Sequence, residues 1–164
     1  MQNTKWKDHV LPEIKTLNGK RVVIRVDWNL PITDGAISDT SRFDVTVPFL
    51  KELAFAGAKI IILTHFGEKG ESLEIIARHV NKNLPFVSFY TSQDFDALEQ
   101  TSQNMERGTA MLLENVRLFE GEMENSLYLA NSFARLGELF INDAFSVSHR
   151  EHASVVGLGK AMPS

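Results

Sequence analysis

Five short, mostly apolar runs are spaced along this chain, and segments with helix-like patterns separate them. The runs cover residues 21–26, 59–64, 86–90, 110–113 and 139–142. Neighbouring parallel strands need a long crossover connection, usually a helix, so this alternation predicts repeated β-α-β units. The second run includes Ile60-Ile61-Ile62-Leu63, as expected for a central strand that is buried on both faces. We therefore predict an α/β fold with a parallel sheet covered by helices.

Four helices are expected between these runs. The first extends from Asp39 or Thr40 to about residue 56, and the second begins at Ser72. The third covers about 94–105 and the fourth about 122–136. Val45, Phe49, Leu53 and Ala56 recur at helical spacing in the first helix. Glycines at 57 and 137 are expected to end the first and fourth helices, and Asp34-Gly35 suits a tight turn within the irregular segment 28–39.

Length and composition narrow the class of protein. A chain of 164 residues is expected to form one domain, spanning residues 1–164. Seventeen basic against 21 acidic residues give a net charge of −4, which argues against broad nucleic-acid binding. The absence of cysteine excludes disulfides and thiolate metal sites. No apolar stretch is long enough to span a membrane and the first residues do not resemble a signal peptide, so we expect a cytoplasmic protein.

Polar and charged residues follow the predicted strands. In parallel α/β sheets, ligands bind beyond the carboxyl ends of the strands. The residues expected at that edge, together with Arg42 in the first turn of the first helix, are Asp27, Trp28, Asn29, His65, Phe66, Gly67, Glu68, Arg117 and Arg150. Arginine presents a fork of donors that matches phosphate and carboxylate. The set suits a small, anionic, hydroxylated ligand.

Three of these residues also have a plain structural interpretation. A cation is unfavourably placed in a first helical turn, which favours an anionic partner for Arg42, but Arg42 could also be an exposed arginine or pair with Asp39. Asp27 could cap a turn. His65, taken alone, is better interpreted as a hydrogen-bonded structural histidine.

Two motifs are partly similar to a zinc site and to a phosphate-binding loop, but they match these patterns poorly. His149 and His152 are three residues apart, and with Asp143 they could be proposed as zinc ligands, but the spacing is weak. Gly157-Leu158-Gly159-Lys160 is similar to the end of a phosphate-binding loop, but Ser154 stands where that pattern requires glycine. A turn or helix start with small residues for close packing explains the second motif better, and we predict no metal site.

Six stretches, taken together and in order, resemble the N-terminal domain of phosphoglycerate kinases. They are Gly19-Lys20-Arg21-Val22-Val23-Ile24-Arg25-Val26-Asp27-Trp28-Asn29-Leu30-Pro31, Asp39-Thr40-Ser41-Arg42, Gly57-Ala58-Lys59, Thr64-His65-Phe66-Gly67, Leu112-Leu113-Glu114-Asn115-Val116-Arg117, and Ile141-Asn142-Asp143-Ala144-Phe145 running into His149-Arg150-Glu151-His152-Ala153-Ser154. The resemblance covers about residues 17–164. It implies a three-layer α/β/α, Rossmann-like fold.

The resemblance also implies an activity: reversible phosphoryl transfer between 1,3-bisphosphoglycerate and ADP in glycolysis, giving 3-phosphoglycerate and ATP. It assigns substrate contacts to Asp27 and Asn29 at the hydroxyl and carboxylate end, and to Arg42, His65, Arg117 and Arg150. Arg42 is similar to the arginine that steadies the transferring phosphoryl group and is the expected catalytic residue. Mg-ATP or Mg-ADP is expected on a C-terminal domain that this chain lacks, with no cofactor bound by the chain itself.

One residue departs from the family pattern. Family members usually have His-Leu-Gly-Arg where this chain has His65-Phe66-Gly67-Glu68. A carboxylate in place of an arginine would repel phosphate if it points inward, so we expect weaker phosphoglycerate binding. Lys69 could supply a cation from a shifted position.

The main hypothesis is therefore the substrate-binding half of an enzyme, monomeric and inactive alone, whose partners are phosphoglycerate and the C-terminal nucleotide domain. Neither nucleic acid nor membrane is an expected partner. The alternatives are a stand-alone, non-catalytic anion-binding domain and an interaction domain whose basic edge contacts a partner.

Overall fold

A five-stranded parallel sheet forms the centre of the computed structural model, which describes residues 13–68, 70–148 and 150–163. Its strands are β1 (Arg21–Val26), β4 (Lys59–Leu63), β5 (Val87–Tyr90), β6 (Ala110–Leu113) and β7 (Leu139–Asp143). The spatial order is β5-β6-β4-β1-β7, and every neighbouring pair is parallel. The five predicted runs are thus confirmed as strands, with bounds that differ by one residue at most.

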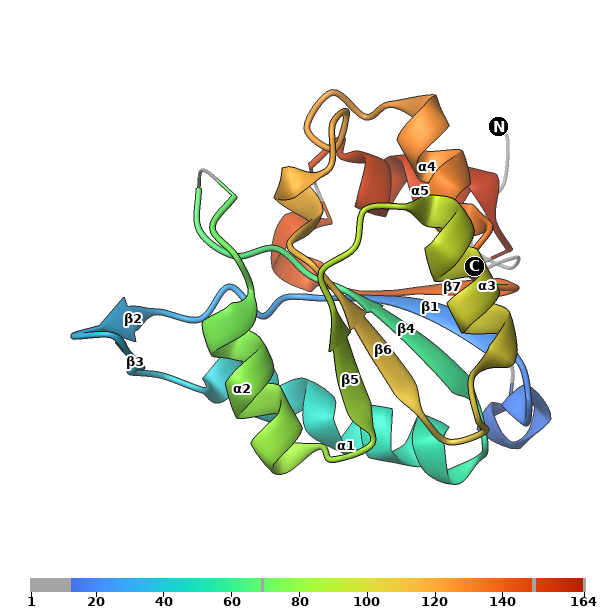
Figure 1. Ribbon diagram of the computed structural model, residues 1–164, viewed down its shortest axis with the longest axis horizontal. Helices are drawn as coiled ribbons and strands as arrows, with labels where there is room; N and C mark the ends of the chain where they lie inside the picture. Colours follow the sequence, from blue (N-terminus) through green and yellow to red (C-terminus); the bar gives the residue numbers. More distant parts are fainter. Residues whose placement is uncertain (1–12, 69, 149, 164) are drawn as a thin grey trace, which may run out of the picture.

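Helices cover both faces of the sheet (Figure 1). Val22 and Ile24 belong to one buried cluster with residues of α1 (Ser41–Phe55) and α2 (Glu74–Asn83). Val23 belongs to a second cluster with residues of α3 (Phe95–Asn104), α4 (Leu127–Ala134) and α5 (Leu158–Ala161). Successive side chains of a strand point to opposite faces, so the two clusters lie on opposite sides of the sheet. The three-layer α/β/α prediction is confirmed.

Shorter elements complete the described chain. Single 3-10 turns lie at Ile14–Leu17, Val116–Leu118 and Phe145–Val147, and a π-helical turn lies at Ala153–Gly157. A small hairpin of β2 (Ile32–Thr33) and β3 (Ala36–Ile37) projects from the body of the molecule (Figure 1). No helix in the described ranges is long and apolar enough to cross a membrane.

Two predicted turns are confirmed by their backbone angles. Asp34 and Gly35 join β2 and β3 with φ of 51° and 76°, the left-handed pair that a tight hairpin turn needs. Gly57 follows the end of α1 with φ of 84°. A Cβ atom at Gly57 would also lie 2.6 Å from Asn18 Oδ1, so glycine is required there for space as well as for conformation.

The fourth helix begins later than predicted. α4 starts at Leu127 instead of about residue 122, because Asn125 has φ of 53° and cannot continue a right-handed helix. Ser126 then caps α4 by accepting a hydrogen bond from the Leu129 N–H. The preceding segment instead carries the buried side chain of Glu122.

The buried face of α1 is also shifted from the predicted one. Val45 is 76% exposed, whereas Phe43, Thr46, Leu50 and Leu53 are buried. Phe43 is drawn inward by aromatic neighbours, since its ring centroid lies 5.2 Å from that of Trp28. The predicted stripe was therefore wrong at Val45 and correct at Leu53.

Gly157 serves close packing, as predicted for its motif. It ends the π-helical turn that leads into α5. A Cβ atom at this position would lie 2.9 Å from Ala130 Cβ and 2.8 Å from Asn125 Oδ1. The glycine thus allows the turn to lie directly against α4.

Candidate functional site

The carboxyl ends of the strands meet at one edge of the sheet. β1 is paired in parallel with both β4 and β7, so Val26 lies opposite Asp143 and Arg25 opposite Leu63. The segments that begin with Asp27, Thr64 and Ala144 therefore leave the sheet side by side. These are the segments for which the sequence predicted a ligand site.

Asp27 and Arg42 form an ion pair at this edge. Arg42 Nη1 donates to Asp27 Oδ2 at 2.9 Å, and the Ser146 hydroxyl donates to the same oxygen. The Arg42 side chain is half exposed, whereas that of Asp27 is mostly buried. Asp39 instead accepts the Ser41 N–H at 2.8 Å, so the predicted alternative of an Arg42–Asp39 pair gives way to Asp27.

A pocket of about 320 Å³ opens beside this pair. It is lined by Asp27, Arg42, Val45, Thr46, Asp143 and Ser146. Burial raises the pKa of the Asp143 carboxyl above its ordinary value. The pocket thus contains one guanidinium group together with hydroxyl and carboxyl groups. The guanidinium can bind the anionic group of a ligand, and the hydroxyl and carboxyl groups can hydrogen-bond its hydroxyl groups.

His65 is buried at the same edge and is uncharged. Its Nδ1 lies 3.1 Å from Arg25 Nη2. Burial, and then the positive charges of Arg25, Arg117 and Arg150, lower the pKa of His65 to about 3, against a smaller opposing effect of Asp27. The hydrogen-bonded interpretation of His65 is therefore correct for Nδ1.

Arg25 is a site-supporting residue that the sequence reasoning missed. It is 1% exposed, and its guanidinium donates to Ser154 Oγ at 3.1 Å and to the Val26 carbonyl oxygen at 2.5 Å. Burial lowers the pKa of Arg25 to about 10, while Glu122 and Asp27 oppose that shift. The available signal was a charged residue within a strand run predicted to be buried, because a buried charge requires partners.

Asn29, Gly67 and Arg117 are connected through the backbone of Gly67. The Gly67 N–H donates to Asn29 Oδ1 at 3.0 Å, and Arg117 Nη1 donates to the Gly67 carbonyl oxygen. Arg117 Nε is buried and has no hydrogen-bond partner among the described residues. Gly67 thus contacts two other predicted site residues, Asn29 and Arg117, which come from two separate segments.

Asn115 organises this loop and was not among the predicted site residues. It is fully buried, and its Nδ2 donates to the carbonyl oxygens of Phe66 and Glu71 at 2.7 and 2.6 Å. Its Oδ1 accepts the N–H groups of Phe66 and Arg117 at 3.3 and 3.1 Å. An asparagine two residues after a strand, at the edge where ligands bind, is the signal that could have identified it.

Trp28 requires a correction. Its side chain was predicted at the ligand edge but is completely buried, with Nε1 donating to Thr46 Oγ1 at 2.9 Å. In extended backbone, successive side chains point to opposite sides, so Asp27 faces the site and Trp28 faces the core. Only the backbone of Trp28 remains at the edge, where its N–H donates to Thr64 Oγ1 at 3.0 Å.

Glu68 and Arg150 are both exposed, and Phe66 is half-buried. Lys69, the residue that could replace the missing cation, and His149, from the zinc interpretation, lie outside the described residues.

His152, the other histidine of the zinc interpretation, has its Nδ1 3.8 Å from Glu122 Oε1. Across 13–68, 70–148 and 150–163, no group of three or more acidic or histidine side chains could hold a metal ion.

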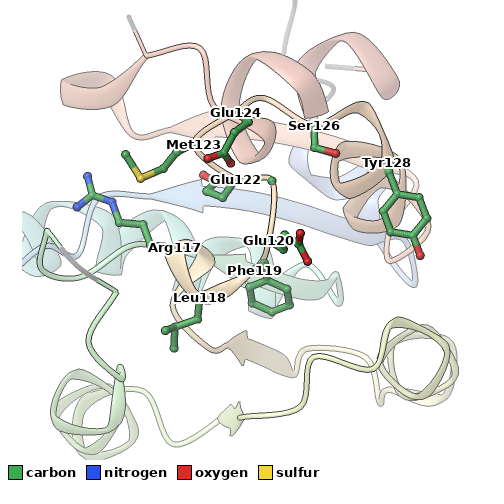
Figure 2. A pocket seen from close by; sticks show the side chains of 10 residues that line it. Arg117, Leu118, Phe119, Glu120, Glu122, Met123, Glu124, Ser126 and Tyr128 are labelled. Carbon is green, nitrogen blue, oxygen red and sulfur yellow. The ribbon is translucent and has the colours of Figure 1, made fainter.

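A larger pocket, of about 740 Å³, lies next to the site (Figure 2). Figure 2 shows Arg117 at one end, Tyr128 at the other and the carboxylates of Glu120 and Glu124 between them. Carboxylates repel an anion. The larger pocket sets three carboxyl groups against one guanidinium, whereas the smaller pocket sets two against one and has one of these, Asp27, already paired with Arg42. The smaller pocket is therefore the better candidate for an anionic ligand.

Comparisons with known proteins agree on one family. The family model described as phosphoglycerate kinase matches residues 12–164. The phosphoglycerate kinases of Sinorhizobium fredii and Chelativorans sp. are 40% and 39% identical over 161 residues, covering 94% of this chain and 40% of each relative. The structure of phosphoglycerate kinase from Coxiella burnetii matches 90% of this chain and 38% of its own, with a TM-score of 0.78 and 33% identity.

A second solved structure, of phosphoglycerate kinase from Pyrococcus horikoshii, matches with a TM-score of 0.77 and 28% identity over 90% of this chain and 39% of that one. The chain spans about 40% of the length of the curated relatives that it matches. The family match covers nearly the whole chain, including every predicted site residue. This chain therefore belongs to the phosphoglycerate kinase family.

Proposed function

We propose that this chain is the phosphoglycerate-binding half of a phosphoglycerate kinase, which exchanges a phosphoryl group between 1,3-bisphosphoglycerate and ADP. The observation that carries the proposal is that the guanidinium groups of Arg42 and Arg117 lie at the sheet edge that holds buried His65, with exposed Arg150 in the segment that follows β7 from the same edge. Three guanidinium groups at one edge repel one another, and a bound anion offsets this repulsion. A ligand with a phosphate at each end fits that arrangement.

The proposed contacts divide between the two ends of the ligand. Arg42 steadies the phosphoryl group that is transferred, and it is the proposed catalytic residue. Arg117, Arg150 and His65 hold the phosphate that is not transferred. Asp27 and Asn29 bind the hydroxyl and carboxyl end. Because Asn29 Oδ1 already accepts the Gly67 N–H, its Nδ2 is the group that remains for the ligand.

The chemistry requires charge stabilisation more than proton transfer. In the ATP-forming direction, a phosphate oxygen of ADP attacks the acyl phosphate, a new P–O bond forms, and the P–O bond to the carboxyl oxygen breaks. The leaving group is a carboxylate, which is stable without a proton at neutral pH. Arginines that position and neutralise the moving phosphoryl group therefore suffice on this side of the reaction.

Mg-nucleotide belongs, in this proposal, to the C-terminal part of the relatives that the chain does not match. We therefore expect the 164-residue chain to bind phosphoglycerate weakly and to form no ATP. Formation of ATP by the chain alone in a coupled assay would contradict this expectation. Monomeric state and cytoplasmic location complete the proposal and are measurable by analytical ultracentrifugation and by fractionation of the source cells.

An NMR titration with 3-phosphoglycerate tests the binding half directly. Saturable shifts are expected around Asp27, Arg117 and Arg150, and Arg42→Ala should weaken them at least tenfold. Arg135→Ala is the matched control, because Arg135 pairs with Asp96 and Glu99 on α3, outside the site. The absence of shifts at millimolar ligand in the folded wild type would overturn the proposal.

A non-catalytic anion-binding domain is the second candidate, and exposed Glu68 is the observation that favours it. A carboxylate at the family's arginine position weakens a phosphate site. Equal affinity for 3-phosphoglycerate and inorganic phosphate, with both sets of shifts confined to Arg42, would support this second candidate over the first.

A further inference from the structure

Four polar side chains form a continuous hydrogen-bonded path behind the candidate site. Glu122 Oε1 accepts from Ser154 Oγ at 2.5 Å, and Ser154 Oγ accepts from Arg25 Nε at 3.1 Å. Arg25 Nη2 then contacts His65 Nδ1 at 3.1 Å. All four residues are buried, with exposed fractions of 0–4%. The path links the segment before α4 to the end of β4.

The chemistry of arginine sets the direction of the last hydrogen bond. A guanidinium group has five N–H donors and no acceptor. His65 Nδ1 must therefore accept, so it carries no proton, and the ring proton is on Nε2. Neutral histidine in water populates both tautomers, so the contact with Arg25 selects one of them.

Glu122 and Ser154 hold Arg25 in place for this contact. Ser154 is fixed to Glu122 twice, because the Ser154 N–H also donates to Glu122 Oε2 at 2.9 Å. The Ala153 N–H donates to the Glu122 carbonyl oxygen at 2.9 Å. Glu122 is also the charge that most favours the protonated form of buried Arg25.

We propose that Arg25 is a positioning residue that fixes His65 as the neutral Nε2–H tautomer, so that the ring offers the ligand a hydrogen-bond donor without a charge. The tautomer is a property of the chain itself, whereas the benefit to a phosphate-bearing ligand rests on the proposed function. A neutral donor suits this edge, where a histidinium would be repelled by neighbouring guanidinium groups.

The charges that face His65 are consistent with this role. Arg25 on β1, Arg117 after β6 and Arg150 after β7 all disfavour protonation of the ring, whereas Asp27 favours it. With burial, these charges lower the pKa of His65 to about 3. His65 therefore stays a neutral donor throughout the physiological range of pH.

The direct test is a long-range ¹H–¹⁵N correlation spectrum of the imidazole groups in the ¹⁵N-labelled chain at pH 7. We expect His65 with unprotonated Nδ1 and protonated Nε2, and no protonation as the pH is lowered to 4.5. A His65 that carries its proton on Nδ1, or that titrates near pH 6.5, would overturn the proposal in the wild-type protein without any variant.

Variants then test whether Arg25 is responsible. Arg25→Met is expected to produce a mixture of tautomers, and Arg25→Lys, which keeps a donor, should restore Nε2–H. Arg21→Met is the matched control, because Arg21 lies on the same strand but contacts Ser102 and the backbone of α4's end. If Arg25→Met does not fold, Glu122→Gln replaces it. An unchanged tautomer in folded Arg25→Met, or in folded Glu122→Gln where Arg25 loses the charge that holds it, would contradict a role for Arg25.

Ligand binding separates this inference from the proposed function. With 3-phosphoglycerate as the probe, Glu122→Gln should weaken binding about fivefold, the loss of roughly one hydrogen bond. If the wild type has the Nε2–H tautomer but binds no 3-phosphoglycerate, the proposed function fails and the tautomer stands. If it binds but His65 is the Nδ1–H tautomer, the inference fails alone.

Discussion

Asn115 pairs with Phe66 through both ends of its side-chain amide. Its Nδ2 donates to the Phe66 carbonyl oxygen at 2.7 Å, and its Oδ1 accepts the Phe66 N–H at 3.3 Å. The side-chain amide of Asn115 therefore bonds to the backbone of Phe66 as a neighbouring strand would, through one donor and one acceptor. The loop that carries Gly67 and Glu68 is therefore held from within by Asn115, the second residue after β6.

Replacing Asn115 by aspartate should test how much this loop depends on it. Asn115→Asp keeps the shape but removes the two Nδ2 donors and buries a charge, so we expect a loss of about 2–4 kcal/mol in the free energy of unfolding. Urea denaturation gives that number. Asn104→Asp is the control: the Nδ2 of exposed Asn104 donates to the Gln100 carbonyl oxygen at 2.9 Å, and the change should cost about 0.5 kcal/mol or less. Equal costs for both variants would show that the Asn115 contacts contribute little.

The strands were predictable because several consecutive residues of each run are apolar and point to the same structure. Ile60, Ile61 and Ile62 are all fully buried, and a run that is apolar at every position has few alternatives to a central strand. The common edge for Asp27, His65 and Arg117 followed from the parallel arrangement alone. These inferences depend on the order of elements and need no knowledge of individual contacts.

The remaining features depend on contacts between distant segments. Trp28 and Asp27 are adjacent, and only the packing of α1 decides which of the two side chains faces the core. The late start of α4 depends on Glu122 being buried against Ser154, 32 residues away. Arg25 lies in a run that predicts a strand correctly, but its side-chain partners come from the segment after β4 and from the π-helical turn at Ala153–Gly157. No local pattern contains that information.

Glu68 gives a prediction about ligand affinity. Glu68→Arg removes a negative charge and adds a positive one beside the proposed phosphate cradle, so 3-phosphoglycerate should bind about fivefold more tightly, a gain of roughly 1 kcal/mol for an exposed charge. Titration calorimetry at low salt measures this. Glu106→Arg makes the same change in net charge at an exposed position that precedes β6, at the opposite edge, and should leave the affinity unaltered. Unchanged affinity in Glu68→Arg would mean that residue 68 does not face the ligand.

Trp28 should matter for stability and not for the ligand. Trp28→Phe loses the hydrogen bond from Nε1 to Thr46 and leaves a small cavity. We therefore expect the free energy of unfolding to fall by about 1–3 kcal/mol. The affinity for 3-phosphoglycerate should stay within about twofold, since the buried ring has no exposed surface. A variant with wild-type stability and much weaker binding would place the indole back among the ligand contacts.

His65 should make the protein less stable as the pH falls below about 6.5. In the unfolded chain, His65 takes up a proton near its ordinary pKa of about 6.5, whereas in the folded protein burial and the nearby guanidinium groups lower that pKa to about 3. Between these values only the unfolded state binds the proton, so the free energy of unfolding falls by at most about 1.4 kcal/mol per pH unit from this group. Above pH 6.5 the ring is neutral in both states and contributes no slope.

Glu122 acts in the opposite direction, so the effect of His65 must be measured as a difference. Burial raises the pKa of Glu122, and the folded protein therefore binds that proton more readily than the unfolded chain does, which adds stability as the pH falls. His65→Gln keeps an acceptor for Arg25 but gains no proton, and it leaves the contribution of Glu122 in place. Urea denaturation at pH 7.5, 6.5, 5.5 and 4.5 should show the wild type losing stability more steeply than His65→Gln below pH 6.5, and the same slope at higher pH. Parallel curves throughout would mean that His65 is protonated equally readily in the folded and unfolded states, and that the contact with Arg25 does not govern its charge.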